Sequence, residues 1–192
     1  MSVAGLILAA GESKRMGSPK ALLEFRGQTF LDRLVDTFTR FCTPVVVVVG
    51  CDAERIRAGV KHPGRILFAE NTDYRLGQLS SMQRGLREIP DTVDGVLFTL
   101  VDHPNVRPST IEILLDPPAP VLAIPRYHGR RGHPMYFRRE LAAEFLALPP
   151  DSQARLVVTR HADQIRYADV DDPGILDDVD DPAAYRRLLE TA

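Results

Sequence analysis

The chain has 192 residues, of which 44% are hydrophobic and 26% are charged, and its formal net charge is -2 at pH 7. This length and composition are typical of a globular protein, and we expect residues 1–192 to form a single domain. The weak net charge gives no general attraction to nucleic acid or to an anionic membrane, so we expect neither as a partner. Any anionic ligand then needs a local basic cluster.

The sequence carries no signal that predicts a membrane or secreted protein. Its apolar runs fall short of the roughly 20 residues of a membrane-spanning helix, and no basic segment precedes the first apolar run. Cys42 and Cys51 are too few for a disulfide framework, and neither has a partner at zinc-binding spacing. We therefore expect a cytoplasmic protein in which both cysteines are buried or half-buried.

Strands and helices are expected to alternate through about residue 125. The apolar run 3–10 ends at Gly11, which predicts a strand buried on both faces. Apolar residues at helical spacing predict a helix over 28–41, and five consecutive valines at 45–49 favour a central strand. Asp52 is expected to cap a short helix. Further strands are expected at 65–69, 95–101 and 121–124, and helices at 77–89 and 108–115.

Beyond residue 125 the alternation becomes less regular. The segment 128–134 is a glycine-rich basic loop, and the proline-rich run 117–120 is interpreted as a rigid loop and not as a domain boundary. The whole pattern favours an α/β fold in which helices cover both faces of an open, mostly parallel sheet. In this last part, strands are expected at 135–138 and 165–170, and helices at 139–148, 152–161 and 182–189.

The loop after the first expected strand is the first candidate site, because ligands of open parallel sheets bind beyond the carboxyl ends of the strands. Gly11 and Gly17 allow tight turns whose backbone N–H groups can surround phosphate oxygens. Arg15 offers a planar fork to phosphate, and Lys20 offers a point charge. The spacing fits neither a Walker A loop nor the three-glycine dinucleotide pattern. The residues alone predict an anion site, with a solvated basic turn as the alternative.

The loop closely resembles the signature of the MobA-like nucleoside triphosphate transferases, which include the molybdenum cofactor cytidylyl- and guanylyltransferases. The resemblance covers nearly the whole chain, with motifs in the same order. It implies the Rossmann-like fold of the nucleotide-diphospho-sugar transferase type, and catalytic roles for Arg15 and Lys20 in neutralising a triphosphate. The nucleotide-binding residues that it implies in this loop are Leu8, Ala9, Ala10, Gly11, Ser13, Arg15, Met16, Gly17 and Lys20.

Asp102 follows the expected strand at 95–101 and lies in the string Asp-His-Pro. A carboxylate at this position can reach the same crevice as the opening loop, and Mg²⁺ typically takes one or two carboxylates and completes its shell with phosphate and water. The alternative is a cap for the next helix, which Pro104 disfavours. The family has a similar Asp-x-Pro string in which the aspartate binds Mg²⁺. The resemblance therefore implies that Asp102 is catalytic and binds the metal.

The segment that follows the third expected strand is a second candidate for nucleotide binding. Gly77 precedes a helix whose N-terminal amides would face the crevice, although a plain serine-rich helix start explains the same residues. A similar Asn-Gly-Ser segment borders the base and ribose in the family. The resemblance therefore implies that Asn71, Gly77 and Ser81 bind the nucleotide.

A second basic cluster lies at 129–134, where two arginines flanked by glycines can hold a second anion such as a substrate phosphate. Its Gly-His-Pro string, followed by an apolar strand, resembles the acceptor-side motif of the cytidylyltransferase branch. The resemblance implies that Gly132 and His133 contact the substrate and do not transfer protons.

An acidic run near the C-terminus is expected to form mainly a solvated loop. Part of it resembles the Asp-x-Asp-x-Pro-x-Asp-Tyr element of the family, but Asp181 stands where threonine is usual and Ala184 where an acidic residue is usual. Asp178 or Asp180 is a candidate for approaching the metal.

The resemblance implies a reaction in which an acceptor phosphate attacks the α-phosphorus of a nucleoside triphosphate and pyrophosphate leaves. Ala10 resembles the cytidylyl branch, because the guanylyl branch tends to have glycine there. CTP and the phosphate of molybdenum-pterin cofactor are thus the first choices of substrate. The alternatives are a cytidylyl- or uridylyltransferase for a sugar or polyol phosphate, and a non-catalytic nucleotide-binding accessory protein for molybdenum hydroxylases. A molybdenum enzyme and a second copy of the chain are the protein partners considered.

Overall fold

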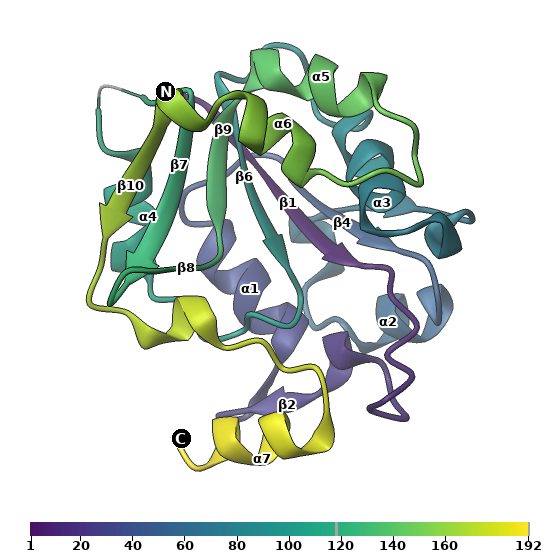
Figure 1. Cartoon of the computed structure of the whole chain (residues 1–192). Coiled ribbons are helices and arrows are strands. Elements are labelled where there is room, and N and C mark those ends of the chain that lie inside the picture. The colour runs from purple at the N-terminus through teal and green to yellow at the C-terminus, as the bar shows by residue number, and fades with distance from the viewer. Residues whose placement is uncertain (118, 192) are drawn as a thin grey trace.

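One mixed sheet organises the computed structural model, which describes residues 1–117 and 119–191. Its strands are β1 (Val3–Ala9), β4 (Val45–Val49), β5 (Leu67–Glu70), β6 (Gly95–Leu100), β7 (Leu122–Tyr127), β8 (Arg130–Arg131), β9 (Met135–Arg138) and β10 (Ile165–Asp169). Their order across the sheet is β10-β7-β9-β6-β1-β4-β5, and β8 pairs with β7 beside this path (Figure 1). A separate small hairpin joins β2 (Glu24–Phe25) to β3 (Gln28–Thr29).

The middle of the sheet is parallel. β1 pairs in parallel with β4 and with β6, so that Leu6 lies opposite both Val46 and Phe98. Every residue of β1 and β4 is buried, which explains why these strands are apolar on both faces. β9 pairs antiparallel with β6 and β7, and β8 antiparallel with β7. The expected open, mostly parallel α/β sheet is confirmed.

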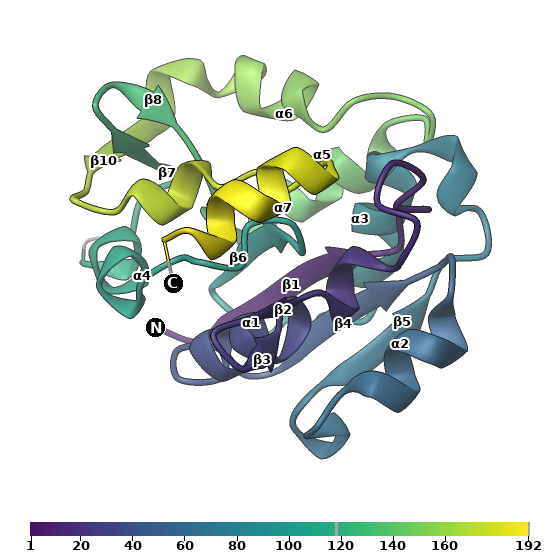
Figure 2. The same ribbon diagram turned by 90° about the horizontal axis from the view of Figure 1, so that it is seen from below.

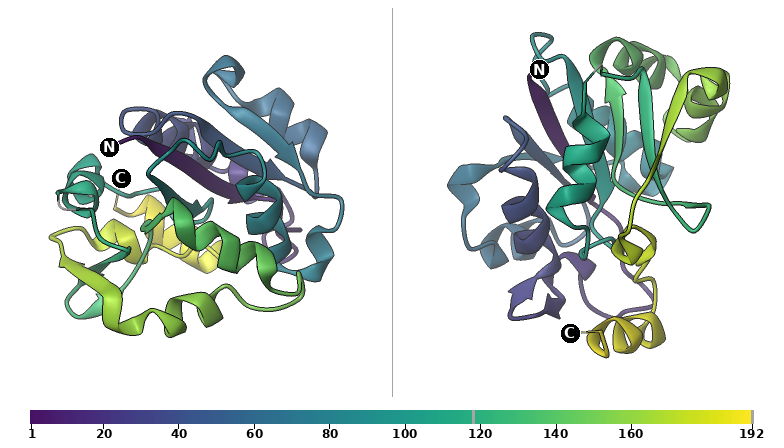
Figure 3. Two further views of the ribbon diagram at one scale, coloured as in Figure 1. Left: turned by 90° about the horizontal axis from the view of Figure 1, so that it is seen from above. Right: turned by 90° about the vertical axis from the view of Figure 1, so that its left-hand side faces the viewer.

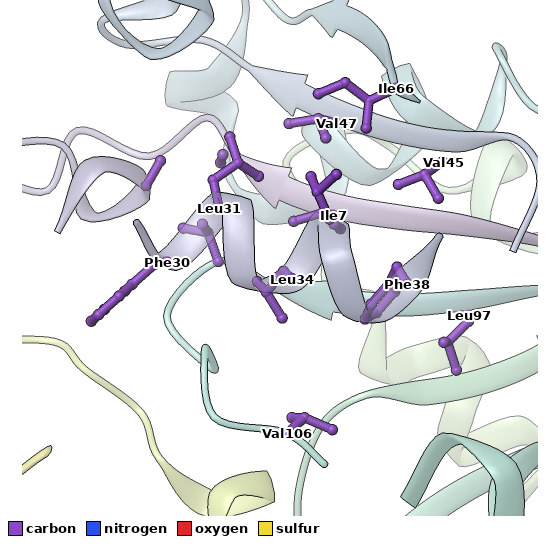
Figure 4. Close-up of a cluster of buried hydrophobic side chains, with 14 of the residues drawn as sticks. Ile7, Phe30, Leu31, Leu34, Phe38, Val45, Val47, Ile66, Leu97 and Val106 are labelled. Atoms are coloured by element: carbon purple, nitrogen blue, oxygen red, sulfur yellow. The ribbon is translucent and has the colours of Figure 1, made fainter. Parts of the chain in front are cut away.

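Helices cover both faces of this sheet. They are α1 (Phe30–Phe38), α2 (Ala53–Gly59), α3 (Gln78–Leu86), α4 (Pro108–Leu115), α5 (Ala142–Ala147), α6 (Arg155–Arg160) and α7 (Pro182–Leu189). Ile7 of β1 packs with Leu34 and Phe38 on one face (Figure 4), whereas Leu6 packs with Met82 on the other. α1 and α4 lie on the first face, and α3, α5 and α6 lie on the second (Figure 2). None of the described helices is long and apolar enough to cross a membrane.

The C-terminal segment returns to the edge where β1 and β6 end. The Val179 N–H donates to the Asp102 carbonyl at 3.1 Å. The Tyr185 hydroxyl donates to the Glu24 carbonyl at 2.7 Å. The centroid of the Tyr185 ring lies 5.9 Å from that of the Phe30 ring, in an edge-to-face arrangement. α7 consequently lies beside the β2–β3 hairpin (Figures 1 and 3). These contacts bring the acidic run next to the candidate site.

Several predicted elements need correction. The helix expected over 28–41 spans only Phe30–Phe38, and Thr29 caps its start by accepting a hydrogen bond from the Asp32 N–H. Asp52 precedes α2, but its side chain makes no capping hydrogen bond because its backbone is left-handed, with φ of 56°. The helix expected at 139–148 divides into a 3₁₀ turn and α5, and the helix expected at 152–161 begins only at residue 155. Both cysteines are buried or half-buried, as expected. Pro118, in the expected rigid loop, lies outside the described residues.

Candidate active site

A cleft of about 430 Å³ opens at the carboxyl edge of the sheet. Because β1 and β6 are parallel neighbours, the segments that follow them emerge at this same edge (Figure 1). Among the expected site residues, the cleft is lined by Leu8, Ala9, Ala10, Gly11, Ser13, Arg15, Lys20, Gly77, Ser81 and Asp102. Asp180, one of the two acidic candidates from the C-terminal run, also lines it. These residues come from four separate parts of the chain.

The opening loop curls around Ser13. The Ser13 carbonyl accepts hydrogen bonds from the N–H groups of Met16 at 2.9 Å and Gly17 at 3.2 Å, and its hydroxyl accepts one from the Lys20 N–H at 3.1 Å. Gly17 has a φ of 69°, whereas a Cβ there would meet nothing within 4 Å. Glycine is therefore favoured by the backbone conformation and not by lack of space. Met16 and Gly17 shape the loop but are not among the residues that line the cleft.

Lys20 connects the loop to two carboxylates. Its Nζ lies 2.9 Å from Asp102 Oδ2 and 2.5 Å from Asp180 Oδ1. Burial works to lower the pKa of Lys20, but the Asp102 and Asp180 carboxylates outweigh it and raise that pKa above its ordinary value. Arg15 is more exposed, and its guanidinium lies 2.8 Å from the same Asp180 carboxylate. The two cations expected to meet a triphosphate therefore lie together beside the cleft.

Asp102 Oδ1 lies in a different environment from Oδ2. Oδ1 is buried, and none of the described residues hydrogen-bonds to it. It lies 3.8 Å from His103 Nε2. Ligand atoms of Asp102, His103 and Asp178 all lie within 4.8 Å of one another. Burial, together with the nearby Asp102 and Asp180, raises the pKa of Asp178, because loss of water and neighbouring negative charges both disfavour its negative form. A divalent cation fits this group, since it would supply the missing positive charge.

Asn71 supports the start of α3 from behind the cleft. It is buried, and its side-chain amide donates to the hydroxyls of Ser80 and Ser81, each at 2.9 Å. Ser81 lines the cleft, as does Gly77 at the N-terminus of the helix, but Asn71 does not. The structure therefore does not place Asn71 in the cleft lining, where it was expected to contact the nucleotide. Asn71 instead orients Ser81, which does line the cleft.

Gly132 and His133 lie beside the carboxylate group but outside the lining of the cleft. The His133 ring centroid is 4.7 Å from that of His103. Burial lowers the pKa of His133 to about 4, which leaves the ring neutral near pH 7. At Gly132 a Cβ would come within 2.2 Å of the Ile175 carbonyl oxygen. Close packing therefore accounts for this glycine.

Among the residues that sequence reasoning missed are His103, Glu12, Tyr74 and Gln78. His103 joins the group with Asp102 and Asp178, whereas the other three line the cleft. The Asp-His-Pro string contained the signal for His103, because it directly follows the expected metal ligand. Tyr74 and Gln78 flank Gly77 in the segment that was expected to bind the nucleotide. Glu12 carried no such signal.

Comparison with known proteins places this arrangement in a family. The model of the MobA-like NTP transferase domain matches residues 5–165. The nicotine blue oxidoreductase of Paenarthrobacter nicotinovorans is 33% identical over 200 residues, which cover 97% of this chain and 96% of that protein. The molybdenum cofactor cytidylyltransferase of Escherichia coli strain K12 is 23% identical over 168 residues, or 86% of each protein.

Solved structures agree with these similarities. The crystal structure of Rv0371c from Mycobacterium tuberculosis H37Rv superposes with a TM-score of 0.83 at 30% identity, covering 98% of this chain and 97% of that one. A complex of Rv0371c with manganese superposes with a TM-score of 0.78 at 27% identity and covers 100% of both chains. The chain belongs to the MobA-like NTP transferase family and is a nucleotidyltransferase.

Proposed function

We propose that the protein transfers CMP from CTP to the phosphate of molybdenum-pterin cofactor and releases pyrophosphate. The observation that carries this proposal is the ion pair of 2.9 Å between Lys20 and Asp102. It joins the loop expected to hold the triphosphate to the carboxylate expected to hold the metal, although the two residues are 82 positions apart in the sequence. The molybdenum cofactor cytidylyltransferase named among the relatives supports this choice of substrates.

The nucleotide would lie along the opening loop, with its base toward the start of α3. Backbone N–H groups of the loop and the exposed Arg15 guanidinium suit phosphate oxygens. Ala10 lines the cleft, and a Cβ at Gly50 would lie 3.0 Å from the Ala10 Cβ. The Ala10 side chain is therefore closely packed and takes up space that glycine would leave open. This crowding favours a pyrimidine base.

The metal would be held by Asp102 with Asp178, and Mg²⁺ is the first ion expected of a site with carboxylate and phosphate ligands. The chemistry that such a cation supplies is neutralisation of charge on the reacting phosphate. Lys20 and Arg15 would stabilise the charge that gathers on the leaving pyrophosphate. An acceptor phosphate is already anionic near neutral pH, so no strong general base is needed. Positioning and charge neutralisation would then supply most of the rate enhancement.

The acceptor would approach from the side of Gly132 and His133, which lie next to His103. A neutral His133 ring can hydrogen-bond to an acceptor without competing for the proton of its phosphate. The hydrogen bond of 3.0 Å from the His133 N–H to the Ile175 carbonyl fixes this segment in place. A sugar or polyol phosphate remains the alternative acceptor.

The oxidoreductase name of one relative points to a different chemistry. Oxidation and reduction need no cations for a leaving pyrophosphate. The grouping of Arg15, Lys20 and Asp102 beside one cleft therefore favours nucleotidyl transfer. The same grouping argues against a purely non-catalytic accessory protein.

Pyrophosphate release tests the proposal. The purified protein with Mg²⁺ and molybdenum-pterin cofactor is given each of the four nucleoside triphosphates in turn, and we expect the fastest release with CTP. Release with CTP or UTP that needs a sugar or polyol phosphate would favour the alternative enzyme. Tight binding of CTP without release, whichever acceptor is added, would favour the accessory protein.

A further inference from the structure

The Asp102 carboxylate divides its two oxygens between a lysine and an imidazole. Oδ2 accepts from Lys20 Nζ at 2.9 Å, whereas Oδ1 lies 3.8 Å from His103 Nε2. Oδ1 has no hydrogen-bond partner among residues 1–117 and 119–191. Buried polar atoms normally have partners, because leaving one without costs about 1–3 kcal/mol. The unpartnered Oδ1 therefore points to a ligand in the space between it and His103 Nε2.

The spacing of the group fits a single cation. Two ligand atoms that each lie about 2.1–2.2 Å from one metal ion can be separated by up to about 4.3 Å. The distance of 3.8 Å between Asp102 Oδ1 and His103 Nε2 lies within that range. Asp178 completes the group, whose ligand atoms all lie within 4.8 Å of one another. One ion shared by all three atoms requires the most distant pair to approach by up to about 0.5 Å.

The burial of His103 indicates that its position beside Asp102 is not incidental. Only 7% of this residue is exposed, and its ring is held between Asp102 and the His133 ring, whose centroid is 4.7 Å away. The imidazole is thus fixed in direction before any ion binds. A ligand held in this way loses little conformational entropy when it coordinates.

The chemistry of an imidazole ligand changes which ion the site prefers. Mg²⁺ takes oxygen ligands in near-ideal octahedral geometry and gives up its waters reluctantly. Imidazole nitrogen suits first-row transition metals better. We propose that His103 coordinates the catalytic cation through its imidazole and makes this site select Mn²⁺ or a similar transition-metal ion over Mg²⁺. This inference rests on the proposed function for its cation but concerns a ligand and a selectivity that the proposed reaction does not require.

Pulsed EPR of bound Mn²⁺ tests the inference without turnover. The complete protein is titrated with Mn²⁺ in the absence of nucleotide and acceptor, and a directly bound imidazole is expected to give a nitrogen hyperfine coupling. His103→Gln should remove that coupling and weaken Mn²⁺ binding by about 10-fold or more, since even outer-shell partners of metal ligands contribute that much. Competition between Mn²⁺ and Mg²⁺ should show that His103→Gln changes the Mg²⁺ affinity by less than about twofold, because Mg²⁺ relies on oxygen ligands.

Two controls keep the test decisive. His62→Gln removes an exposed imidazole elsewhere on the surface and should keep both the coupling and the affinity. Circular dichroism should show that His103→Gln is folded. If the variant is not folded, the presence or absence of nitrogen coupling in the unaltered protein tests the inference by itself. Absence of nitrogen coupling in that protein, or its persistence in folded His103→Gln, would overturn the inference. Nitrogen coupling in a protein that transfers no nucleotide would instead overturn only the proposed function.

Discussion

The two basic clusters of this chain differ in how their charges are held. In the opening loop, Lys20 is largely buried and lies between Asp102 and Asp180. In the hairpin of β7 and β8, Arg130 and Arg131 are exposed, and the Arg131 guanidinium stacks 4.6 Å from the centroid of the Tyr167 ring. Neither of these arginines lines the cleft. Only the first cluster therefore meets carboxylates at a concave surface.

This difference shows what turns a basic loop into a candidate active site. Both clusters combine glycines with arginine or lysine over a short stretch, so composition alone does not separate them. The opening loop is distinguished by its place at the end of β1, beside the end of β6. That place supplies Asp102, and the returning C-terminal segment supplies Asp178 and Asp180. Topology, and not charge, selects the site.

The largest effect should come from the carboxylate that joins the two sides of the site. Asp102→Asn keeps the shape of the side chain but removes its charge, so the expected several kcal/mol of lost stabilisation lower kcat by about 10³-fold or more. Pyrophosphate release measures the effect, and thermal unfolding should show a folded protein. Asp151→Asn alters an exposed carboxylate and is the matched control. Near-full activity in Asp102→Asn would contradict the assignment of Asp102 as a metal ligand.

The next largest effect should come from Lys20, the half-buried cation of the loop. Lys20→Met keeps much of the length and apolar stem of the side chain but removes the ammonium group that pairs with Asp102. We expect kcat to fall by about 10²–10³-fold, as for other groups that stabilise charge in a transition state. Steady-state pyrophosphate release with CTP provides the measurement. A change only in KM would show that Lys20 binds the nucleotide equally in the ground and transition states.

The glycines of the two basic segments should differ in their effect on stability. Gly132→Ala places a Cβ 2.2 Å from the Ile175 carbonyl oxygen, and we expect the free energy of unfolding to fall by about 3 kcal/mol. Gly17→Ala meets no atom within 4 Å but must adopt a φ of 69°, which costs about 1 kcal/mol. Urea denaturation of both variants tests the difference. Equal losses would show that the hairpin can move away from Ile175.

The smallest effect should come from the exposed arginine of the hairpin. Arg131→Ala removes the contact of its guanidinium with the Tyr167 ring, and we expect a loss of about 0.5–1 kcal/mol in stability. Because Arg131 does not line the cleft, pyrophosphate release at saturating CTP should stay within about twofold, which corresponds to under about 0.5 kcal/mol. A fall as large as that of Lys20→Met would place Arg131 in the acceptor site and erase the contrast between the clusters.

Local patterns predicted the elements and only part of the site. The five valines of β4 and the helix that begins at Pro108 were expected with the observed bounds, because β-branching and a proline at the first turn act within a few residues. The cap expected at Asp52 was wrong because the backbone there is left-handed. Local propensity does not determine that conformation, which depends on how the chain packs after β4.

The rest of the site depends on contacts between distant residues. His103 and Asp178 come together where the Val179 N–H donates to the Asp102 carbonyl and the C-terminal run lies beside the cleft. The supporting role of Asn71 depends likewise on the position of the α3 serines. Sequence patterns identified the types of residue that chemistry would need. They did not determine which carboxylate would lie near Asp102 and which would pair with Lys20.

The fate of labelled phosphate tests most directly whether this cleft performs nucleotidyl transfer. CTP labelled at the α-phosphate, incubated with the protein, a divalent cation and molybdenum-pterin cofactor, should pass its label to the cofactor. CTP labelled at the γ-phosphate should yield labelled pyrophosphate at the same rate. Both rates should fall together in Asp102→Asn. Recovery of the α-label only in unreacted CTP, or transfer that persists unchanged in Asp102→Asn, would contradict the account.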